Sequence, residues 1–209
     1  MDLVRASHLY KVFGKNERQV IERLKAGESR EELASLGTAA VIDVSFEVAK
    51  GETFVVMGLS GSGKSTLIRM INGLWSPSEG TVEVAGKVVS GMNDAQMRAL
   101  RRDHVSMVFQ HFALLPHLTV RENAAYGLKL QGKLKQKERL EKANEWLNTV
   151  GLNGWGDKYP HQLSGGMQQR VGLARALAAE TDILLMDEAF SALDPLIRRE
   201  MQDQLLELQ

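Results

Sequence analysis

The sequence of 209 residues contains no cysteine. This absence excludes disulfide bonds, thiolate catalysis and cysteine-ligated zinc, and it favours a reducing compartment, the cytoplasm. The sequence also has no excess of charge of one sign, because 26 basic residues balance 26 acidic ones. A balanced chain has no net field to gather nucleic acid or an anionic membrane, so no nucleic-acid partner is expected.

Long apolar runs are absent as well. The first residues lack the apolar stretch of a secretory signal, and no segment approaches the roughly 18 apolar residues that a membrane span needs. A role at a membrane would therefore depend on a partner subunit. The histidines do not show metal-ligand spacing with carboxylates, and surface or packing roles are predicted for all five, which are His8, His104, His111, His117 and His161.

Apolar periodicity indicates an α/β fold of about one domain. Residues 41–48 alternate, with apolar Ile42, Val44, Phe46 and Val48 on one predicted buried face. Residues 53–57 are continuously apolar, which is typical of a strand buried on both faces of a parallel sheet. Further strands are predicted at 81–85, 105–109 and 183–186, with helical stretches between them.

Two regions depart from this alternation. Residues 15–40 form a charged, helix-prone insertion, predicted as two short surface helices, of which the second begins with the capping-box pair Ser29 and Glu32 and ends at Gly37. Residues 112–165 have weak strand signals and a helix-like run at 136–150. They are predicted to form a helical subdomain.

A glycine-rich loop follows the predicted strand at 53–57. Its sequence, Gly58-Leu-Ser-Gly-Ser-Gly-Lys64-Ser65, matches the phosphate-loop pattern GxxxxGK[ST] and precedes a helix that is predicted to run to Asn72. The residues expected to bind ATP here are Gly58, Ser60, Gly61, Ser62, Gly63, Lys64, Ser65 and Thr66. Lys64 supplies charge to the β- and γ-phosphates, Ser65 offers a hydroxyl to Mg²⁺, and Thr66 reaches the α-phosphate. A simple glycine turn is the alternative interpretation, which the strand and helix on either side disfavour.

The strand at 183–186 ends in two adjacent carboxylates. Because parallel strands present their carboxyl ends to the ligand, Asp187 is predicted to hold Mg²⁺ and Glu188 to polarise the attacking water. Alone, the pattern also fits a buried strand followed by an acidic turn.

Residues 163–170 read Leu-Ser-Gly-Gly-Met-Gln-Gln-Arg and open a helical run to Ala178. Here the sequence resembles the ABC ATPases, whose signature is LSGGQ, although Met167 stands at the glutamine position and Gln168 follows. A Ser-Gly-Gly helix start exposes backbone N–H groups and a positive dipole end, which is an anion site. The resemblance implies that Ser164, Gly165, Gly166 and Gln168 contact the ATP of a second copy.

The same resemblance assigns three further positions. Gln110 matches the loop glutamine that senses Mg²⁺ and water, and Asp194 closes the segment 191–194, which crosses between two subunits. Phe13 matches the aromatic residue that stacks on adenine, with Tyr10 as the alternative. Residues 112–123, with Leu114, Leu115 and Pro116, are the predicted contact with a permease, although they could equally be local core.

Longer stretches across the chain resemble the ATPase subunits of bacterial glycine betaine and proline importers. This resemblance implies a P-loop NTPase core with a mostly parallel sheet, a small antiparallel part and a helical subdomain. It also implies a homodimer over two ATP and Mg²⁺, a transmembrane permease and an extracytoplasmic solute-binding protein, at the cytoplasmic face of the plasma membrane. Since no residue of this chain is expected to touch the solute, an importer for another small solute is the alternative.

The sequence ends at Gln209, before the strand that carries the family's switch histidine. We therefore expect the C-terminal part of the domain to be missing, and nucleotide binding without productive hydrolysis is an alternative. A chromosome-maintenance ATPase is disfavoured because no sustained heptads lie between Ser65 and Leu163. A two-domain ribosomal ABC protein would need a second copy of these motifs, and a GTPase or kinase would leave the motif at 163 unexplained.

Overall fold

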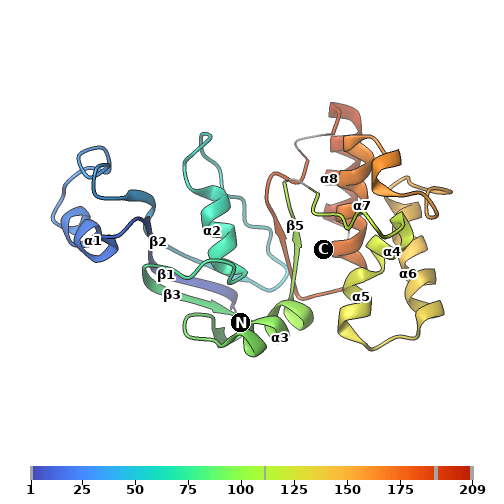
Figure 1. Ribbon diagram of the computed structural model, residues 1–209, viewed down its shortest axis with the longest axis horizontal. Coiled ribbons are helices and arrows are strands. Elements are labelled where there is room, and N and C mark those ends of the chain that lie inside the picture. Colours follow the sequence, from blue (N-terminus) through green and yellow to red (C-terminus); the bar gives the residue numbers. More distant parts are fainter. Residues whose placement is uncertain (1, 111, 191–192, 208–209) are drawn as a thin grey trace. The chain divides into compact units, whose positions relative to one another are not determined.

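The computed structural model describes residues 2–110, 112–190 and 193–207. The chain divides into two compact units with a boundary between residues 98 and 99, and each unit has its own elements and core. Figure 1 labels the helices and strands.

The first unit contains a four-stranded antiparallel sheet with the order β2-β1-β3-β4. Its strands are β1 (Asp2–Phe13), β2 (Thr38–Ala49), β3 (Glu79–Val84) and β4 (Lys87–Val88). Its helices are α1 (Glu17–Lys25) and α2 (Lys64–Ile71), and α3 (Asp94–His104) begins at its end. The predicted strands at 41–48 and 81–85 and the helix to Asn72 are thereby confirmed.

A bulge changes which face of β2 is buried. Leu9 of β1 pairs with Val44 but Lys11 pairs with Val41, so β2 holds an extra residue between these pairs, and Asp43 has a φ of 48°. The extra residue shifts the alternation of side chains beyond it. Val41 is consequently 5% exposed and Ile42 is 37% exposed, so the prediction of Ile42 on the buried face is wrong.

The predicted strand at 53–57 is also wrong, because this segment forms neither a strand nor a ladder. The ring of Phe54 stacks on Phe46 of β2 at a centroid distance of 4.9 Å, but Val55 is 68% exposed and Met57 88% exposed. An apolar run indicates that a segment is buried, but it does not show whether another strand is available to pair with it. An inner strand of a parallel sheet is hydrogen-bonded to a neighbouring strand at each edge. The ladders described in the first unit join only β1, β2, β3 and β4 to one another.

The insertion is less helical than predicted. Its first half forms α1, which buries Val20 and Ile21 in a small cluster with Tyr10, Val12 and Leu33 of the same unit. Its second half forms only turns, so the second helix is wrong. The capping pair is present, since the Ser29 N–H donates to Glu32 Oε2 at 2.8 Å, but bonds of one helical turn are too few to offset the cost of nucleation.

The second unit joins a parallel strand pair to a set of helices (Figure 1). The strands are β5 (Val105–Val108) and β6 (Ile183–Met186), as predicted. The helices are α4 (Val120–Ala124), α5 (Tyr126–Gln131), α6 (Gln136–Thr149), α7 (Gly165–Ala178) and α8 (Pro195–Glu207), with a 3₁₀ turn at Pro160–Gln162. The predicted helices at 136–150 and up to Ala178 are confirmed. Parallel pairing within the described residues is limited to this one pair, a smaller share than the sequence indicated, because 53–57 joins no ladder.

The core of the second unit lies where α4, α6 and α7 meet. Ala124, Leu147, Val171 and Ala174 are each at most 1% exposed, and the alanines let the helices approach closely. Met201 of α8 is also buried, whereas Leu196 is 67% exposed, so Leu196 lies off the packed face of α8. Whether residues 112–165 form a separate subdomain stays a prediction.

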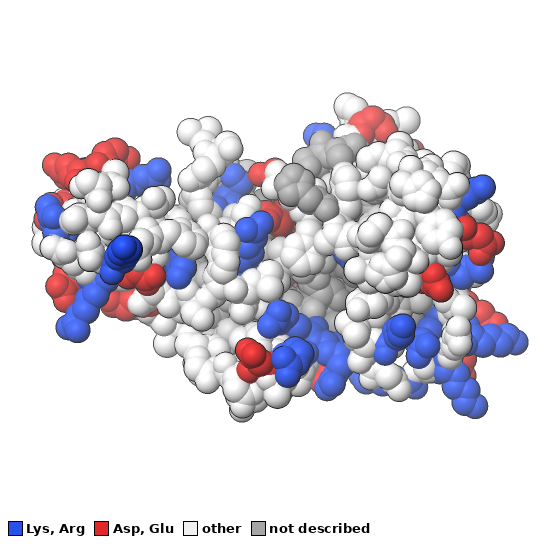
Figure 2. All heavy atoms as spheres, viewed as in Figure 1, with Lys and Arg blue, Asp and Glu red and all other residues white. Residues whose placement is uncertain are grey.

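The surface carries charges of both signs. Figure 2 shows Lys and Arg side chains interspersed with Asp and Glu over the visible face. Among the residues that the structure describes, no helix combines the length and the apolar character that crossing a bilayer requires.

Candidate functional site

The Lys64 side chain is hydrogen-bonded to the start of the phosphate loop. Gly63, with a φ of 93°, is the N-cap of α2, and Lys64 is the first residue of that helix. The Lys64 ammonium donates to the carbonyl oxygens of Gly58 and Leu59, both at 2.9 Å. The lysine therefore lies across the start of the loop, at the positive end of a helix dipole.

Three of the loop glycines have structural reasons to be glycine. A Cβ on Gly63 would collide with the Ala40 carbonyl oxygen of β2, and a Cβ on Gly58 would lie 2.5 Å from Ser62 Oγ. Gly61 has a φ of 77°, which also favours glycine. The packing and backbone conformation of the loop therefore require glycine at these positions, in addition to the close approach of a phosphate.

The predicted phosphate ligands of the first unit become more buried from the loop into α2. Ser60, Gly61 and Ser62 are exposed, Gly63 to Ser65 are half-buried, and Thr66 is buried. A groove of about 550 Å³ runs between β2 and the loop, and Gly58, Ser62 and Lys64 are among its lining residues. The loop is therefore accessible to a ligand, and the individual phosphate contacts stay predictions.

Phe13 and Tyr10 differ sharply in exposure. Phe13 is 38% exposed at the end of β1, whereas Tyr10 is 5% exposed within the small cluster that α1 completes. Burial raises the pKa of the Tyr10 hydroxyl. A ring inside that cluster has no open face for a base, so the geometry supports Phe13 as the stacking residue.

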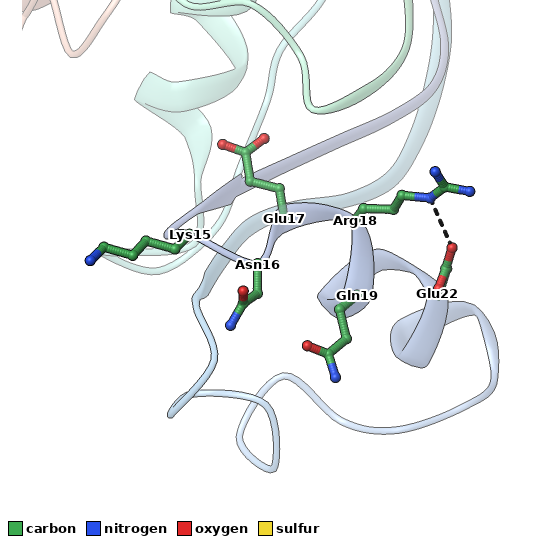
Figure 3. Close-up of a pocket in the computed structure, with 6 residues that line it drawn as sticks. All are labelled: Lys15, Asn16, Glu17, Arg18, Gln19 and Glu22. Carbon is green, nitrogen blue, oxygen red and sulfur yellow. Dashed lines mark hydrogen bonds and ion pairs between the residues drawn. The ribbon is translucent and has the colours of Figure 1, made fainter.

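A second hollow, of about 480 Å³, lies at the start of α1 and is lined by Lys15, Asn16, Glu17, Arg18, Gln19 and Glu22. Figure 3 shows that these side chains spread in different directions, and its one dashed line joins Arg18 to Glu22. Because the groups do not converge on a point, we do not assign a ligand site there.

The carboxylates of the second unit lie at the end of β6, as the sequence predicts. Asp187 is 2% exposed, and its N–H donates to the Val108 carbonyl oxygen of β5 at 3.0 Å. Glu188 has a φ of 49°, in the left-handed region that non-glycine residues rarely adopt. The Gln110 amide nitrogen donates to Glu188 Oε2 at 2.7 Å, which brings two predicted catalytic residues together.

The predicted metal ligands offer the donors that Mg²⁺ prefers. An ionised carboxylate only accepts hydrogen bonds, so the amide nitrogen of Gln110 faces Glu188 and its amide oxygen is the atom left for a cation. Asp187 carries a carboxylate, and Ser65, which belongs to the other unit, carries a hydroxyl; that the two share one Mg²⁺ ion stays a prediction. These are hard oxygen ligands, and Mg²⁺ binds through a few of them together with substrate phosphates. Within the described ranges, no three His, Asp or Glu side chains cluster as a metal site on their own.

The signature motif begins α7. Ser164 is the N-cap residue, and its hydroxyl accepts from the Met167 N–H at 3.3 Å. Ser164 and Gly165 are exposed, and Gly166 is half-buried. The Gln168 side chain donates to the Leu163 carbonyl oxygen at 3.2 Å, within its own helix start. The positive end of a 14-residue helix is therefore accessible to an anion.

The segment 191–194 is only partly described. Ser191 and residue 192 lie outside the described residues. Asp194 Oδ1 accepts from the Leu196 and Ile197 N–H groups at 3.2 and 3.1 Å, so this carboxylate caps α8. Its predicted contact with a second subunit stays a prediction.

Sequence reasoning missed two residues of α7 that touch this region. Gln169 is 1% exposed, and its amide nitrogen donates to the Glu188 carbonyl oxygen at 3.4 Å. Arg175 donates to the carbonyl oxygens of Ala113 and Phe112, at 2.7 and 3.1 Å. The sequence offered no signal that singles them out, because α7 also contains Gln168 and Arg170, and no local pattern names partners so distant in the chain.

The comparison with protein families decides the identity. The family model described as "ABC transporter" matches residues 41–191, which is more than half of the chain. The chain belongs to the ABC transporter family. The resemblance carried by the phosphate loop and the signature motif is thereby confirmed, and membership in this ATP-binding family implies that the domain binds nucleotide.

Curated ABC transporter relatives resemble nearly the whole chain. The glycine betaine transport ATP-binding protein OpuAA of Bacillus subtilis is 54% identical over 207 residues, which cover 98% of this chain and 49% of the relative. The glycine betaine/proline betaine transport system ATP-binding protein ProV of Escherichia coli is 51% identical, with 97% and 51% covered. The chain therefore spans about half the length of these relatives.

A solved ABC cassette confirms the fold class. The dimeric ATP-binding cassette MJ0796 in a post-hydrolysis state, bound to ADP and Pi, superposes with a TM-score of 0.85 and 32% identity. The match covers 98% of this chain and 82% of that one. The ABC ATPase fold is thus shown for the chain as a whole.

Proposed function

We propose that the chain is the ATP-binding part of a bacterial importer for glycine betaine and similar compatible solutes. The substrate class is supported by relatives 51–54% identical to this chain, which are named as glycine betaine transport ATP-binding proteins. No residue of this chain is expected to contact the solute, so an importer ATPase for another small solute is the second candidate. It is favoured by the similarity to the trimethylamine N-oxide transport system ATP-binding protein TmoW of Ruegeria pomeroyi, at 47% identity.

One observation carries the proposed mechanism: the chain has two accessible helix N-termini with phosphate-binding sequences. The start of α2 carries Lys64, and the start of α7 carries Ser164 and Gly165. One nucleotide needs only one phosphate loop, so the second helix start is explained if it covers the ATP of another copy. The solved relative MJ0796 is described as dimeric, which supports this arrangement.

In this mechanism, Lys64 would neutralise charge on the β- and γ-phosphates. Ser65, Asp187 and Gln110 would hold a Mg²⁺ ion, whose charge would stabilise the phosphoryl oxygens. Glu188 orients and polarises the attacking water. Gln110 fixes the Glu188 carboxylate through the bond of 2.7 Å, so loss of Gln110 would misplace the base as well as a metal ligand. Ser164, Gly165 and Gly166 of a second copy complete the pocket.

The permease contact is proposed for residues 112–123. Leu114 packs against the helical core, whereas Pro116 and His117 are exposed. Asn123 is fully buried and donates to the carbonyl oxygens of Leu115 and Leu118 at 3.0 and 3.1 Å, which fixes the shape of this loop. A fixed, partly apolar loop fits a permease helix at the cytoplasmic face of the membrane, with an extracytoplasmic binding protein delivering the solute.

Association over ATP tests the dimeric mechanism. In the Glu188→Gln chain, which should bind but not hydrolyse ATP, we expect Mg-ATP to convert monomer to dimer in sedimentation-velocity experiments. Adding Gly165→Asp should abolish the dimer, because a carboxylate would face the partner's phosphates. A negative charge at the N-terminus of α7 stabilises the helix through its dipole, so a loss of the dimer would not reflect unfolding of that helix.

Two controls complete this experiment. Asn153→Asp adds the same charge at an exposed position outside α7 and should leave the dimer intact. Lys64→Ala should prevent association because the nucleotide no longer binds. A dimer that survives Gly165→Asp would contradict the proposed pocket.

Solute transport is tested in membranes that contain the partner permease. Uptake of labelled glycine betaine should require ATP and stop with Lys64→Ala. ATP-dependent uptake of a different solute, with glycine betaine neither transported nor competing, would favour the second candidate.

A further inference from the structure

The exposed ring of Phe13 has an aromatic neighbour that the proposed function does not use. Trp75 meets Phe13 edge to face, with a centroid distance of 5.0 Å and an interplanar angle of 76°. The Lys11 ammonium lies 5.2 Å from the Phe13 centroid, over its face. All three residues belong to the first unit, as does the phosphate loop. Trp75 and Lys11 thus both contact the Phe13 ring, one in a T-shaped pair and the other over the ring.

We propose that Trp75 is a positioning residue that holds the Phe13 ring in the orientation in which it stacks on the base of the bound nucleotide. This inference rests on the proposed nucleotide site. It adds a residue that shares no sequence motif with the loop and that does not itself need to touch the nucleotide.

The backbone around Trp75 is fixed to α2. The N–H groups of Leu74 and Trp75 both donate to the Arg69 carbonyl oxygen, at 2.9 and 3.1 Å. The buried Asn72 side chain accepts a second contact from the Leu74 N–H at 3.0 Å. Gly73 makes the turn with a φ of 69°. Trp75 therefore leaves α2 in a defined direction.

The Trp75 ring is held on its face as well. The Arg69 guanidinium carbon lies 4.9 Å from the ring centroid, a cation–π geometry. Because α2 begins at Lys64, one short helix carries both the phosphate-binding lysine and the arginine that supports Trp75. The phosphate end and the base end of the proposed site are thereby connected through a single rigid element.

The same segment is tied to β1 beside Phe13. Ser78 Oγ accepts from the Val12 N–H at 3.1 Å, and the Ser78 N–H donates to the Tyr10 carbonyl oxygen at 2.8 Å. Residues 74–78 are therefore bonded to α2 at one end and to β1 at the other. Trp75 lies between these attachments, so its ring restricts Phe13 without depending on a flexible loop.

An edge-to-face pair that restricts a stacking ring lowers the conformational entropy lost when the base binds. Removing the Trp75 ring should weaken ATP binding by between about two- and tenfold, the range that such aromatic pairs support. A ligand with phosphates but no base should be unaffected, since it binds at the loop alone.

The test compares ATP with inorganic tripolyphosphate by titration calorimetry. We expect Trp75→Leu and Phe13→Leu each to weaken ATP binding in the stated range and to leave tripolyphosphate affinity within about twofold. Trp75→Phe, which keeps an aromatic edge, should restore most of the ATP affinity. A double variant should be no worse than Phe13→Leu alone, because Trp75 acts only through Phe13.

Fluorescence supplies a second readout. The chain has three tryptophans, and Trp146 and Trp155 belong to the second unit. ATP should change the emission in the unchanged chain, tripolyphosphate should not, and Trp75→Phe should remove the ATP-dependent change.

Two results would overturn the inference alone: an ATP affinity that Trp75→Leu leaves unchanged while Phe13→Leu lowers it, or a parallel loss of ATP and tripolyphosphate affinity. An unchanged chain that binds neither ligand would instead overturn the proposed function, and the inference with it.

Discussion

Arg175 supports an unusual stretch of backbone next to Gln110. Phe112 and Ala113 have φ values of 52° and 47°, a conformation that costs non-glycine residues roughly 1–3 kcal/mol each. Arg175 donates to both of their carbonyl oxygens. Burial lowers the pKa of Arg175, but a guanidinium stays charged in proteins, so both bonds are charge-assisted.

Replacing Arg175 by methionine should therefore destabilise the second unit. We expect Arg175→Met to lower the free energy of unfolding by about 2–3 kcal/mol, because two charge-assisted hydrogen bonds are lost while the apolar stem is kept. Urea denaturation measures the change. Arg199→Met, at an exposed position of α8, is the matched control and should change the free energy by less than about 0.5 kcal/mol. Equal effects of the two substitutions would contradict this role.

Most of the site residues could be named from sequence because their chemistry is local. The spacing from Gly58 to Thr66 and the adjacent pair Asp187 and Glu188 are properties of short segments. Trp75, Gln169 and Arg175 could not be found in this way. The hydrogen bonds of Arg175 join residues 62 and 63 positions apart, and no periodicity encodes such a separation.

At the scale of elements, the insertion of the first unit depends on acidic side chains. The Arg23 guanidinium hydrogen-bonds Glu28, which lowers the pKa of that carboxyl. The Ser29 backbone N–H and hydroxyl lower the pKa of Glu32. A carboxyl whose pKa is lower in the folded state stabilises that state above its ordinary pKa of about 4, and this stabilisation is lost as the pH falls through the lower, folded value.

Acid should therefore loosen the turn at residues 28–36 before it affects α2. We expect hydrogen-exchange protection there, corrected for the intrinsic rate, to fall as the pH drops below about 4. A Glu28→Gln and Glu32→Gln double variant should show reduced protection already at neutral pH and little further loss in acid. Protection in the double variant that follows the same pH curve as the unchanged chain would contradict this assignment.

Elements with strong periodic patterns could be predicted, and those that depend on a partner could not. The strands at 105–109 and 183–186 and the helices at 136–150 and 165–178 follow from apolar patterns and a serine N-cap. The segment at 53–57 has an equally strong apolar run but no ladder. The turn at 28–36 has the right cap, yet its bonds do not extend into a helix, and a cap alone does not set helix length.

At the scale of the whole molecule, proposed dimerisation couples stability to both ATP and protein concentration. A ligand that binds only the folded state at 100 times its Kd adds about 2.7 kcal/mol of stability. If two copies associate over ATP, the stability also depends on protein concentration, because association favours the folded state. A monomeric nucleotide-binding chain would show only the first dependence.

Melting temperatures separate these two cases. For Glu188→Gln with saturating Mg-ATP, we expect the melting temperature to rise with protein concentration. Without nucleotide, and in Lys64→Ala with nucleotide, the melting temperature should stay constant over the same concentrations. A rise that is independent of protein concentration would contradict association over ATP while leaving nucleotide binding intact.

The left-handed backbone of Glu188 has a consequence for engineering this protein. Glycine or asparagine would occupy a φ of 49° more readily than glutamate does. A laboratory selection that rewards only heat resistance would therefore favour replacing the very carboxylate proposed to activate water. Mutant libraries made to raise the thermostability of this domain should keep position 188 fixed, or should be screened for ATP turnover as well as for thermostability.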